Sequence, residues 1–164
     1  MKNIIEKLKE ENIVIVFDFD GVLGSYEYKD GNHVISPDQS DWNKFVKEQH
    51  PYKDTSIIRP FKILKEFIKN KDISDIYVCS CTSSKEERDG KSEYIQREYG
   101  ILPENIHFVT NKEDKLEYLI ELHKEKYNYL SENQIAIIED DVSTLDNIMR
   151  YSSFMTVHIS SFLD

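Results

Sequence analysis

Five short runs of apolar residues recur along the chain, and stretches with a different pattern separate them. The runs are rich in β-branched and aromatic residues and occupy residues 13–17, 76–79, 106–109, 135–138 and 154–159. Most of them are continuous and do not alternate with polar residues, which is typical of strands covered on both faces. The pattern therefore predicts five buried strands.

Between these runs, apolar residues recur every three or four positions, which is the spacing of one helix face. Helices are predicted at residues 61–68, 86–99, 116–127 and 143–150, and a short amphipathic helix near the amino terminus. Pro60 is expected to be the first residue of the earliest of the four. Strands that alternate with helices favour an α/β protein, here a Rossmann-like three-layer sandwich with a mostly parallel central sheet of about five strands.

Residues 24–59 interrupt this alternation. A turn signal at residues 30–32 predicts a β-hairpin flap, and a short helix is expected to follow it. Trp42, Phe45 and Val46 share one face of that helix, and we expect them to anchor it to the core; stacking on a substrate base is the other interpretation. We interpret residues 24–59 as a small insert within a single domain that comprises residues 1–164.

Composition narrows the possible partners. The chain has 164 residues and a net charge of −10, which disfavours binding to extended nucleic acid or to an anionic membrane. It shows neither a bilayer-spanning apolar run nor the apolar core of a signal peptide, so a cytoplasmic location is expected. Cys79 and Cys81 are expected to be free thiols in a reducing compartment.

Acidic side chains follow two of the predicted strands. The first strand leads into Asp18 and Asp20, and the fourth leads into Glu139, Asp140 and Asp141. The carboxyl ends of parallel strands meet at one edge of a sheet, where ligands bind in α/β proteins. Several carboxylates close together require protons or a cation to offset their charge, and Mg²⁺ prefers oxygen ligands.

The other two strand ends supply groups that suit a phosphate. Ser80 ends the second strand and Thr82 follows it, while Lys112 and Lys115 follow the third strand. With a cation and a lysine present, a carboxylate can attack phosphorus as a nucleophile and a second carboxylate can act as acid and base. The histidines lack the spacing of a zinc site.

The DFDGVL segment at residues 18–23 resembles the first motif of the haloacid dehalogenase-like (HAD) phosphohydrolases, Asp-x-Asp-Gly-Thr/Val-Leu. The resemblance implies that Asp18 is the nucleophile and that Asp20 is the acid and base. It extends over nearly the whole chain, because three further motifs follow in the order that the family shows.

The hydroxyl of the second HAD motif is matched by Ser80, with Thr82 as the alternative. The lysine of the third motif is matched by Lys115, with Lys112 as the alternative. The acidic pair of the fourth motif is matched by Glu139 and Asp140, after which Asp141 caps the last helix.

The resemblance also implies a bound Mg²⁺. Its ligands are expected from Asp18, the backbone carbonyl of Asp20, and Asp140, and Glu139 or Asp141 is expected to support these ligands from behind. Further contacts to the substrate are expected from Gly21, Thr82 and Arg59.

The expected function is therefore that of a Mg²⁺-dependent phosphomonoesterase with an aspartyl-phosphate intermediate. Its substrate is expected to be a phosphorylated small molecule or nucleotide, and a polynucleotide end is another candidate. Two alternatives stay open: a phospho-accepting domain of the receiver type and a catalytically silent phosphate-binding module. Receivers place the nucleophile on a different strand from their acidic pair, and a silent module is expected to lack one of the carboxylates.

Overall fold

A parallel sheet of five strands forms the centre of the computed structural model, which describes residues 3–25, 28–29, 32–33, 37–38, 40–55 and 57–163. The strands lie in the order β7-β6-β1-β8-β9, and every neighbouring pair is parallel. They are β1 (Val14–Phe17), β6 (Ile76–Cys81), β7 (Ile106–Val109), β8 (Ile135–Glu139) and β9 (Met155–His158). The five predicted strands and the predicted α/β class are confirmed.

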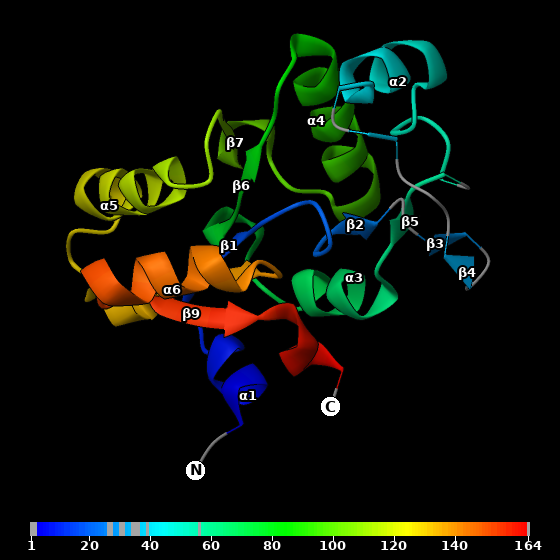
Figure 1. Ribbon diagram of the computed structural model, residues 1–164. Coiled ribbons are helices and arrows are strands. Elements are labelled where there is room, and N and C mark those ends of the chain that lie inside the picture. Colours follow the sequence, from blue (N-terminus) through cyan, green and yellow to red (C-terminus); the bar gives the residue numbers. More distant parts are fainter. Residues whose placement is uncertain are drawn as a thin grey trace.

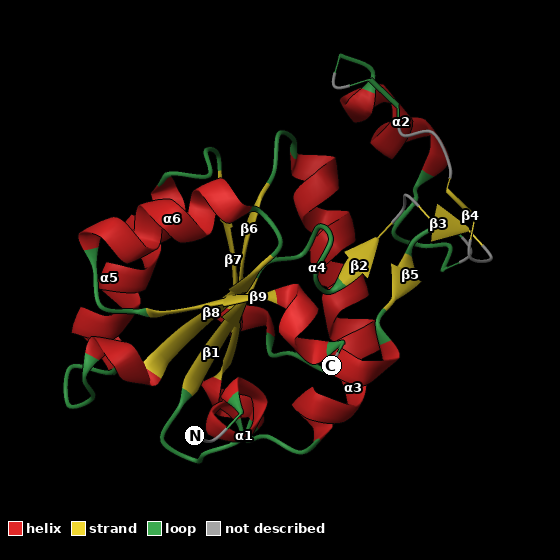
Figure 2. Cartoon of the chain, turned by 60° about the horizontal axis from the view of Figure 1, so that its bottom comes forward, coloured by secondary structure: helices red, strands yellow, loops and turns green. Residues whose placement is uncertain are grey.

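Helices cover both faces of the sheet and complete the three layers (Figures 1 and 2). The helices α1 (Ile4–Leu8), α3 (Lys62–Lys69) and α4 (Lys85–Tyr99) pack on one face, and α5 (Asp114–Lys126) and α6 (Val142–Tyr151) pack on the other. The predicted helices are thus all present, with ends that differ by a few residues. The expected three-layer sandwich is confirmed.

The residues of β1 explain why its apolar run is continuous. Ile15 and Phe17 belong to the core on the α3 and α4 side, whereas Val14 and Val16 belong to the core on the α5 and α6 side. Successive side chains of a strand point to opposite faces, so a strand covered on both sides needs an apolar residue at every position. Burial of each such side chain stabilises the fold by about 1.5–3 kcal/mol.

The order of the strands determines where a ligand can bind. From β1 the chain continues to β6 and β7 on one side, and it then returns to β8 and β9 on the other side of β1. The direction of winding therefore reverses beside β1. In open α/β sheets, ligands bind beyond the carboxyl ends of the strands at such a reversal, so the segment that follows Phe17 lies at the expected place.

The insert after β1 is tied at its base by a short antiparallel pair, β2 (Gly24–Ser25) and β5 (Arg59–Pro60). This pair corrects one prediction: Pro60 is not the first helical residue, because it pairs with Gly24 as extended chain, and α3 begins at Lys62. The Tyr99 hydroxyl strengthens the base, since it accepts a hydrogen bond from the Phe61 amide at 3.0 Å and donates one to the Leu23 carbonyl.

The insert itself contains the expected hairpin and helix. The strands β3 (Tyr28–Lys29) and β4 (Asn32–His33) pair in antiparallel fashion, which confirms the hairpin, while its turn residues 30–31 lie outside the described residues. The helix α2 (Trp42–Gln49) follows and lies beside α4 (Figure 1).

The anchoring of α2 is confirmed as predicted from its apolar face. Val46 is buried in the core, and Trp42 and Phe45 are partly buried against it. The Ser83 hydroxyl also donates a hydrogen bond to the Asn43 side chain at 2.7 Å. These contacts fix α2 near the carboxyl end of β6.

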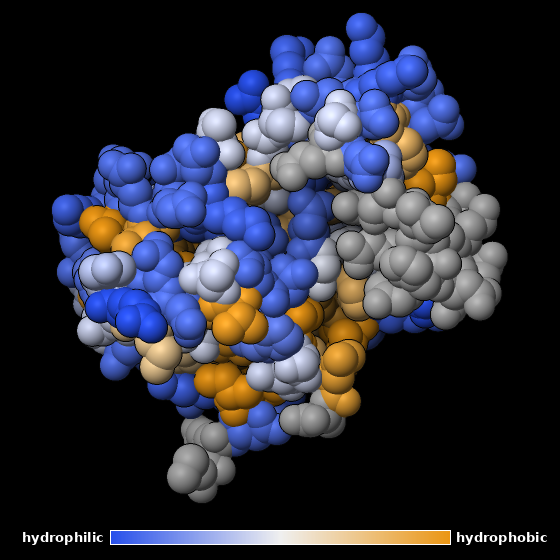
Figure 3. Space-filling view, viewed as in Figure 1, coloured by the Kyte–Doolittle hydropathy of each residue, from blue (hydrophilic) through white to orange (hydrophobic). Residues whose placement is uncertain are grey.

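Two predictions from composition are also supported. Cys79 and Cys81 are free thiols in the described chain. None of the helices among the described residues has the length and apolar character needed to cross a membrane. Hydrophilic residues cover most of the face seen in Figure 3, including the surface of α2.

Candidate active site

Asp18 lies directly beyond the end of β1, where the backbone still follows the sheet. Its amide donates a hydrogen bond to the Ile138 carbonyl of β8 at 2.9 Å, which holds it beside that strand. The next residue, Phe19, is fully buried, and its ring packs edge-on against Tyr94 with ring centroids 5.4 Å apart. Phe19 fills the core on the α4 side and stands between Asp18 and Asp20 in the sequence. The two aspartates contact different lysines.

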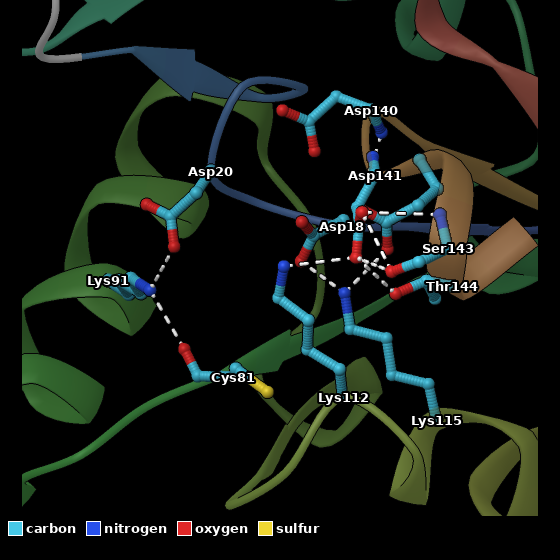
Figure 4. A network of polar contacts seen from close by, with 11 residues as sticks. Asp18, Asp20, Cys81, Lys91, Lys112, Lys115, Asp140, Asp141, Ser143 and Thr144 are labelled. Atoms are coloured by element: carbon cyan, nitrogen blue, oxygen red, sulfur yellow. Dashed lines mark hydrogen bonds and ion pairs between the residues drawn. The ribbon is translucent and has the colours of Figure 1, made fainter.

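Asp18 is held in an ionic cluster with Lys115 and Glu139. Figure 4 shows the side chains of Asp18 and Lys115 side by side. Lys115 Nζ lies 3.0 Å from Asp18 Oδ1 and 2.6 Å from Glu139 Oε2, and all three side chains are buried. Burial raises the pKa of Asp18; Lys115 opposes that rise and Glu139 adds to it. The cluster therefore contains two carboxylates and one ammonium group, which leaves one negative charge without a cation among these three side chains.

Asp20 has a lysine of its own. Lys91 of α4 is fully buried, and its Nζ lies 2.7 Å from Asp20 Oδ2, 2.9 Å from Glu87 Oε1 and 3.0 Å from the Cys81 carbonyl. The other oxygen, Asp20 Oδ1, has no hydrogen-bond partner among the described residues. Burial raises the pKa of Asp20 while Lys91 opposes the rise. Asp20 is thus fixed through one oxygen, and its other oxygen is available to carry a proton.

The end of β8 supplies the remaining carboxylates. Glu139 Oε1 accepts hydrogen bonds from the amides of Asp140 and Asp141, both at 3.2 Å. Asp141 caps α6 through the Ser143 amide and binds Lys112 Nζ at 3.0 Å. The Asp140 residue is exposed overall, and its pKa is raised because its carboxylate is partly desolvated and lies near Asp18. Asp140 is therefore the acidic residue of this segment that faces the solvent.

Gly21 allows the two strand ends to approach each other. Its φ angle is +73°, and a Cβ placed on it would lie 2.2 Å from Asp140 Oδ2. Any other residue at this position would be strained in its backbone and would displace the Asp140 carboxylate. The glycine of the DFDGVL segment is explained by this contact.

A cavity of about 390 Å³ opens between these groups. Asp18, Asp20 and Gly21 line it from the β1 side, together with Ser25 and Cys81. The remaining walls come from the β7–α5 and β8–α6 segments: Lys112, Lys115, Glu139, Asp140 and Asp141. The structure thus brings together the residues predicted for the first, third and fourth motifs.

The residues predicted for the second motif lie elsewhere. Ser80 is fully buried, its Oγ has no hydrogen-bond partner among the described residues, and it does not line the cavity. Cys81, the next residue of β6, lines the cavity because successive side chains alternate between faces. Thr82 lines an adjoining cavity. Arg59 is exposed in β5 and is not among the residues that line either cavity. The catalytic role assigned to Ser80 and the substrate contacts assigned to Thr82 and Arg59 stay predictions.

The acidic residues fit a divalent cation. Asp18, Glu139 and Asp140 each offer a carboxylate oxygen, and these oxygens lie within 4.8 Å of one another. Glu139 is already bound to Lys115 and to two amides, which leaves Asp18 and Asp140 as the residues with ligand capacity toward the cavity. Oxygen ligands from one or two carboxylates, with water completing the shell, are typical of Mg²⁺ in phosphate chemistry.

Replacement of Gly21 by alanine tests the approach of β1 to β8. We expect Gly21→Ala to abolish any metal-dependent activity of the site, because the new methyl group displaces Asp140. Gly100→Ala is the matched control, since Gly100 also has a positive φ of +68° but nothing within 4 Å of the added Cβ. Both variants should lose about 1 kcal/mol of unfolding free energy to backbone strain. Equal activity in the two variants, measured as phosphate release, would contradict the assignment of Asp140.

Two residues of the site were not predicted from the sequence. Lys91 and Glu87 stand four positions apart in α4, a spacing usually found in exposed ion pairs on a helix. Both are buried, and Lys91 also binds Asp20. The burial of the helix face that carries them arises from the packing of α4 against Phe19, which a local pattern does not reveal.

Comparison with known proteins adds a likeness of fold. Neither a protein-family model nor a curated protein matches the chain. Among solved structures, the chain is similar to the HAD domain of the effector protein Lem4 from Legionella pneumophila, with 13% sequence identity and a TM-score of 0.47. The likeness covers 89% of this chain and 84% of that chain. It concerns the fold, and the chemistry of the site is inferred from the residues of this chain.

Proposed function

We propose that this protein is a Mg²⁺-dependent phosphomonoesterase in which Asp18 is the nucleophile. The observation that carries the proposal is the buried Asp18–Lys115–Glu139 cluster at the carboxyl end of β1, with Asp20 held separately by Lys91. A phosphate in the 390 Å³ cavity would lie among Asp18, Lys112 and Lys115. The HAD resemblance of the motifs supports the same roles.

In the first step, an Asp18 carboxylate oxygen attacks phosphorus and the bond to the leaving oxygen breaks. Asp20 donates its proton to that oxygen, and the product alcohol leaves behind an aspartyl-phosphate. The raised pKa of Asp20 favours the protonated form that this step needs. Lys115 holds the Asp18 carboxylate in place through its ion pair.

In the second step, Asp20 accepts a proton from water, and the water oxygen attacks phosphorus. Inorganic phosphate leaves and the Asp18 carboxylate is restored. Mg²⁺, held by Asp18 and Asp140, would supply positive charge that offsets the repulsion between phosphate and carboxylates. Lys112 is anchored to Asp141 at the cavity wall and adds a further positive charge there.

Metal removal tests the proposal. We expect release of phosphate from p-nitrophenyl phosphate in the presence of Mg²⁺, loss of that activity in EDTA, and recovery when Mg²⁺ is added back. Asp140→Asn should raise the Mg²⁺ concentration needed for half-maximal rate by on the order of 10-fold or more, because one ligand loses its charge.

The matched control is Asp146→Asn, which changes an exposed aspartate of α6 and should leave the metal dependence unchanged. Turnover that persists undiminished in EDTA would overturn the proposal. Phosphorylation of Asp18 without turnover would favour the receiver-like alternative, and phosphate binding without covalent chemistry would favour the silent module.

A further inference from the structure

A second cavity, of about 630 Å³, adjoins the cavity that holds Asp18. The two share Asp20, Cys81 and Lys112 in their walls, so one molecule can extend from one cavity into the other. The shared wall contains Asp20, the residue that would donate a proton to the leaving oxygen. A substrate whose phosphate lies at Asp18 can therefore extend past Asp20 into this second cavity.

The wall of the second cavity contains one aromatic surface and several neutral polar groups. Trp42 of α2 is the aromatic residue, and the side chains of Asn43, Thr82, Ser83 and Thr110 add an amide and three hydroxyls. Trp42 is partly buried against the core and also lines the cavity, so the core fixes its position. A fixed aromatic wall suits a flat ring, and the amide and hydroxyls suit sugar hydroxyls and ring edges.

The charged residues that line the cavity, Asp20, Glu87 and Lys112, are each already held in an ion pair. Lys91 pairs with both Asp20 and Glu87, and Lys112 pairs with Asp141. A leaving group with additional charges would have to break these pairs, whereas a neutral group leaves them intact. The volume of the second cavity, about 630 Å³, lies within the range of roughly 300–1,000 Å³ that is typical of pockets for drug-sized ligands. The cavity can therefore hold a group larger than a single phenyl ring.

The second cavity is connected to Asp20 by a chain of contacts. The Trp42 side chain donates a hydrogen bond to the Glu87 carboxylate, Glu87 binds Lys91, and Lys91 binds Asp20. The Ser83 amide also donates to Glu87 at 2.8 Å. The aromatic wall and the proton donor are therefore positioned by the same buried charges.

From this geometry we infer that the second cavity binds a nucleoside, with its base on Trp42, so that the substrate is a nucleoside monophosphate. This inference rests on the proposed phosphatase function and names its substrate. A mononucleotide is favoured over a polynucleotide end because the chain carries a net charge of −10, which repels a polyanion.

Tryptophan fluorescence provides a test that needs no catalysis, because Trp42 is the single tryptophan of the chain. Adenosine or uridine should quench the emission saturably, whereas ribose at the same concentration should not, since only a base stacks on the indole. Quenching by p-cresol but not by the nucleosides would overturn the inference in favour of an aryl leaving group. Equal quenching by ribose, or no quenching at all, would also overturn it.

Kinetics give a second measurement. AMP should have a kcat/KM on the order of 10- to 100-fold above that of ribose 5-phosphate, the size expected for stacking of one base. A higher kcat/KM for the terminal phosphate of a short oligonucleotide than for AMP would overturn the choice of a mononucleotide.

Two variants test whether the second cavity, and not the phosphate site, determines the preference for AMP. Trp42→Phe should retain part of the preference for AMP, and Thr110→Lys, which fills the cavity from an exposed position, should remove it. The reference substrate is acetyl phosphate, whose leaving group is too small to reach Trp42, and each variant should lower kcat/KM for AMP by a larger factor than kcat/KM for acetyl phosphate. If Thr110→Lys kept the full preference for AMP, the inference would be wrong even if the protein folds normally. Nucleoside quenching without any phosphatase activity would instead refute the proposed function alone.

Discussion

Asp18→Asn is expected to lower the rate of phosphate release by at least about 1,000-fold, as is usual when a nucleophile is removed. An amide oxygen is a far weaker nucleophile than a carboxylate, and Asp18 is the carboxylate that Lys115 holds at the base of the cavity. The rate is measured as Mg²⁺-dependent phosphate release from p-nitrophenyl phosphate at saturating substrate.

The loss of activity in Asp18→Asn should come without unfolding. The variant removes a charge that burial and Glu139 disfavour, and it leaves Lys115 paired with Glu139 at 2.6 Å. We therefore expect the free energy of unfolding to change by no more than about 1 kcal/mol. Asp146→Asn on the exposed face of α6 is the control and should retain full activity. An Asp18→Asn protein that still turns over at the wild-type rate would exclude Asp18 as the nucleophile.

A covalent intermediate would distinguish the nucleophile from a mere metal ligand. In Asp20→Asn, the attack of Asp18 on p-nitrophenyl phosphate needs little acid catalysis, because the nitrophenolate leaves readily. Hydrolysis of the aspartyl-phosphate, however, loses its base. We expect the phosphorylated protein to accumulate, with the added group mapped by mass spectrometry to the peptide that contains Asp18.

The strands of the sheet could be predicted because the pattern that defines each one lies within a few consecutive residues. A strand covered on both faces must be apolar at every position, and a run such as residues 13–17 shows this directly. Pro60 was not predictable in the same way. A proline before an apolar periodic segment is compatible with a helix start, but here Pro60 pairs with Gly24, 36 positions earlier by numbering, and that pairing is not encoded in nearby residues.

The same distinction separates the predicted and missed residues of the site. Asp18, Asp20 and Asp140 were predicted because each lies within three residues of the end of a recognisable strand. Lys91 was missed because its partner Asp20 lies 71 positions away in the sequence. Ser80 and Cys81 illustrate a further limit, since a shift of one position on a strand exchanges the face to which a side chain points.

Lys91→Met is expected to be the most destabilising single substitution of the site. Lys91 is fully buried and forms ion pairs with Glu87, which is also buried, and with Asp20. Removal of one partner of a buried ion pair leaves a buried charge uncompensated and typically costs about 3–5 kcal/mol of unfolding free energy. Urea denaturation at neutral pH measures the loss.

The control for Lys91→Met is Lys85→Met on the same helix. Lys85 is 79% exposed on its side chain and binds Asp89 at the same four-residue spacing, 2.9 Å away. An exposed pair of this kind contributes at most about 1 kcal/mol. Equal losses of unfolding free energy in the two variants would show that the buried ion pairs of Lys91 contribute no more to stability than the exposed pair of Lys85.

The pH dependence of the unfolding free energy provides a second test of why Lys91→Met is destabilising. In the wild type, burial favours a higher pKa for Glu87, but the charge of Lys91 and the hydrogen bonds from Ser83, Lys91 and Trp42 together lower the pKa. The stabilisation from Glu87 is therefore lost as the pH falls. In Lys91→Met the positive charge that opposes burial is gone, so the pKa of Glu87 should rise and the already raised pKa of Asp20 should rise further. The destabilisation should then shrink as the pH falls from 7 toward 4, because the two carboxylates take up protons. A difference in unfolding free energy between wild type and Lys91→Met that stays constant over this range would mean that lost packing, and not uncompensated charge, causes the destabilisation.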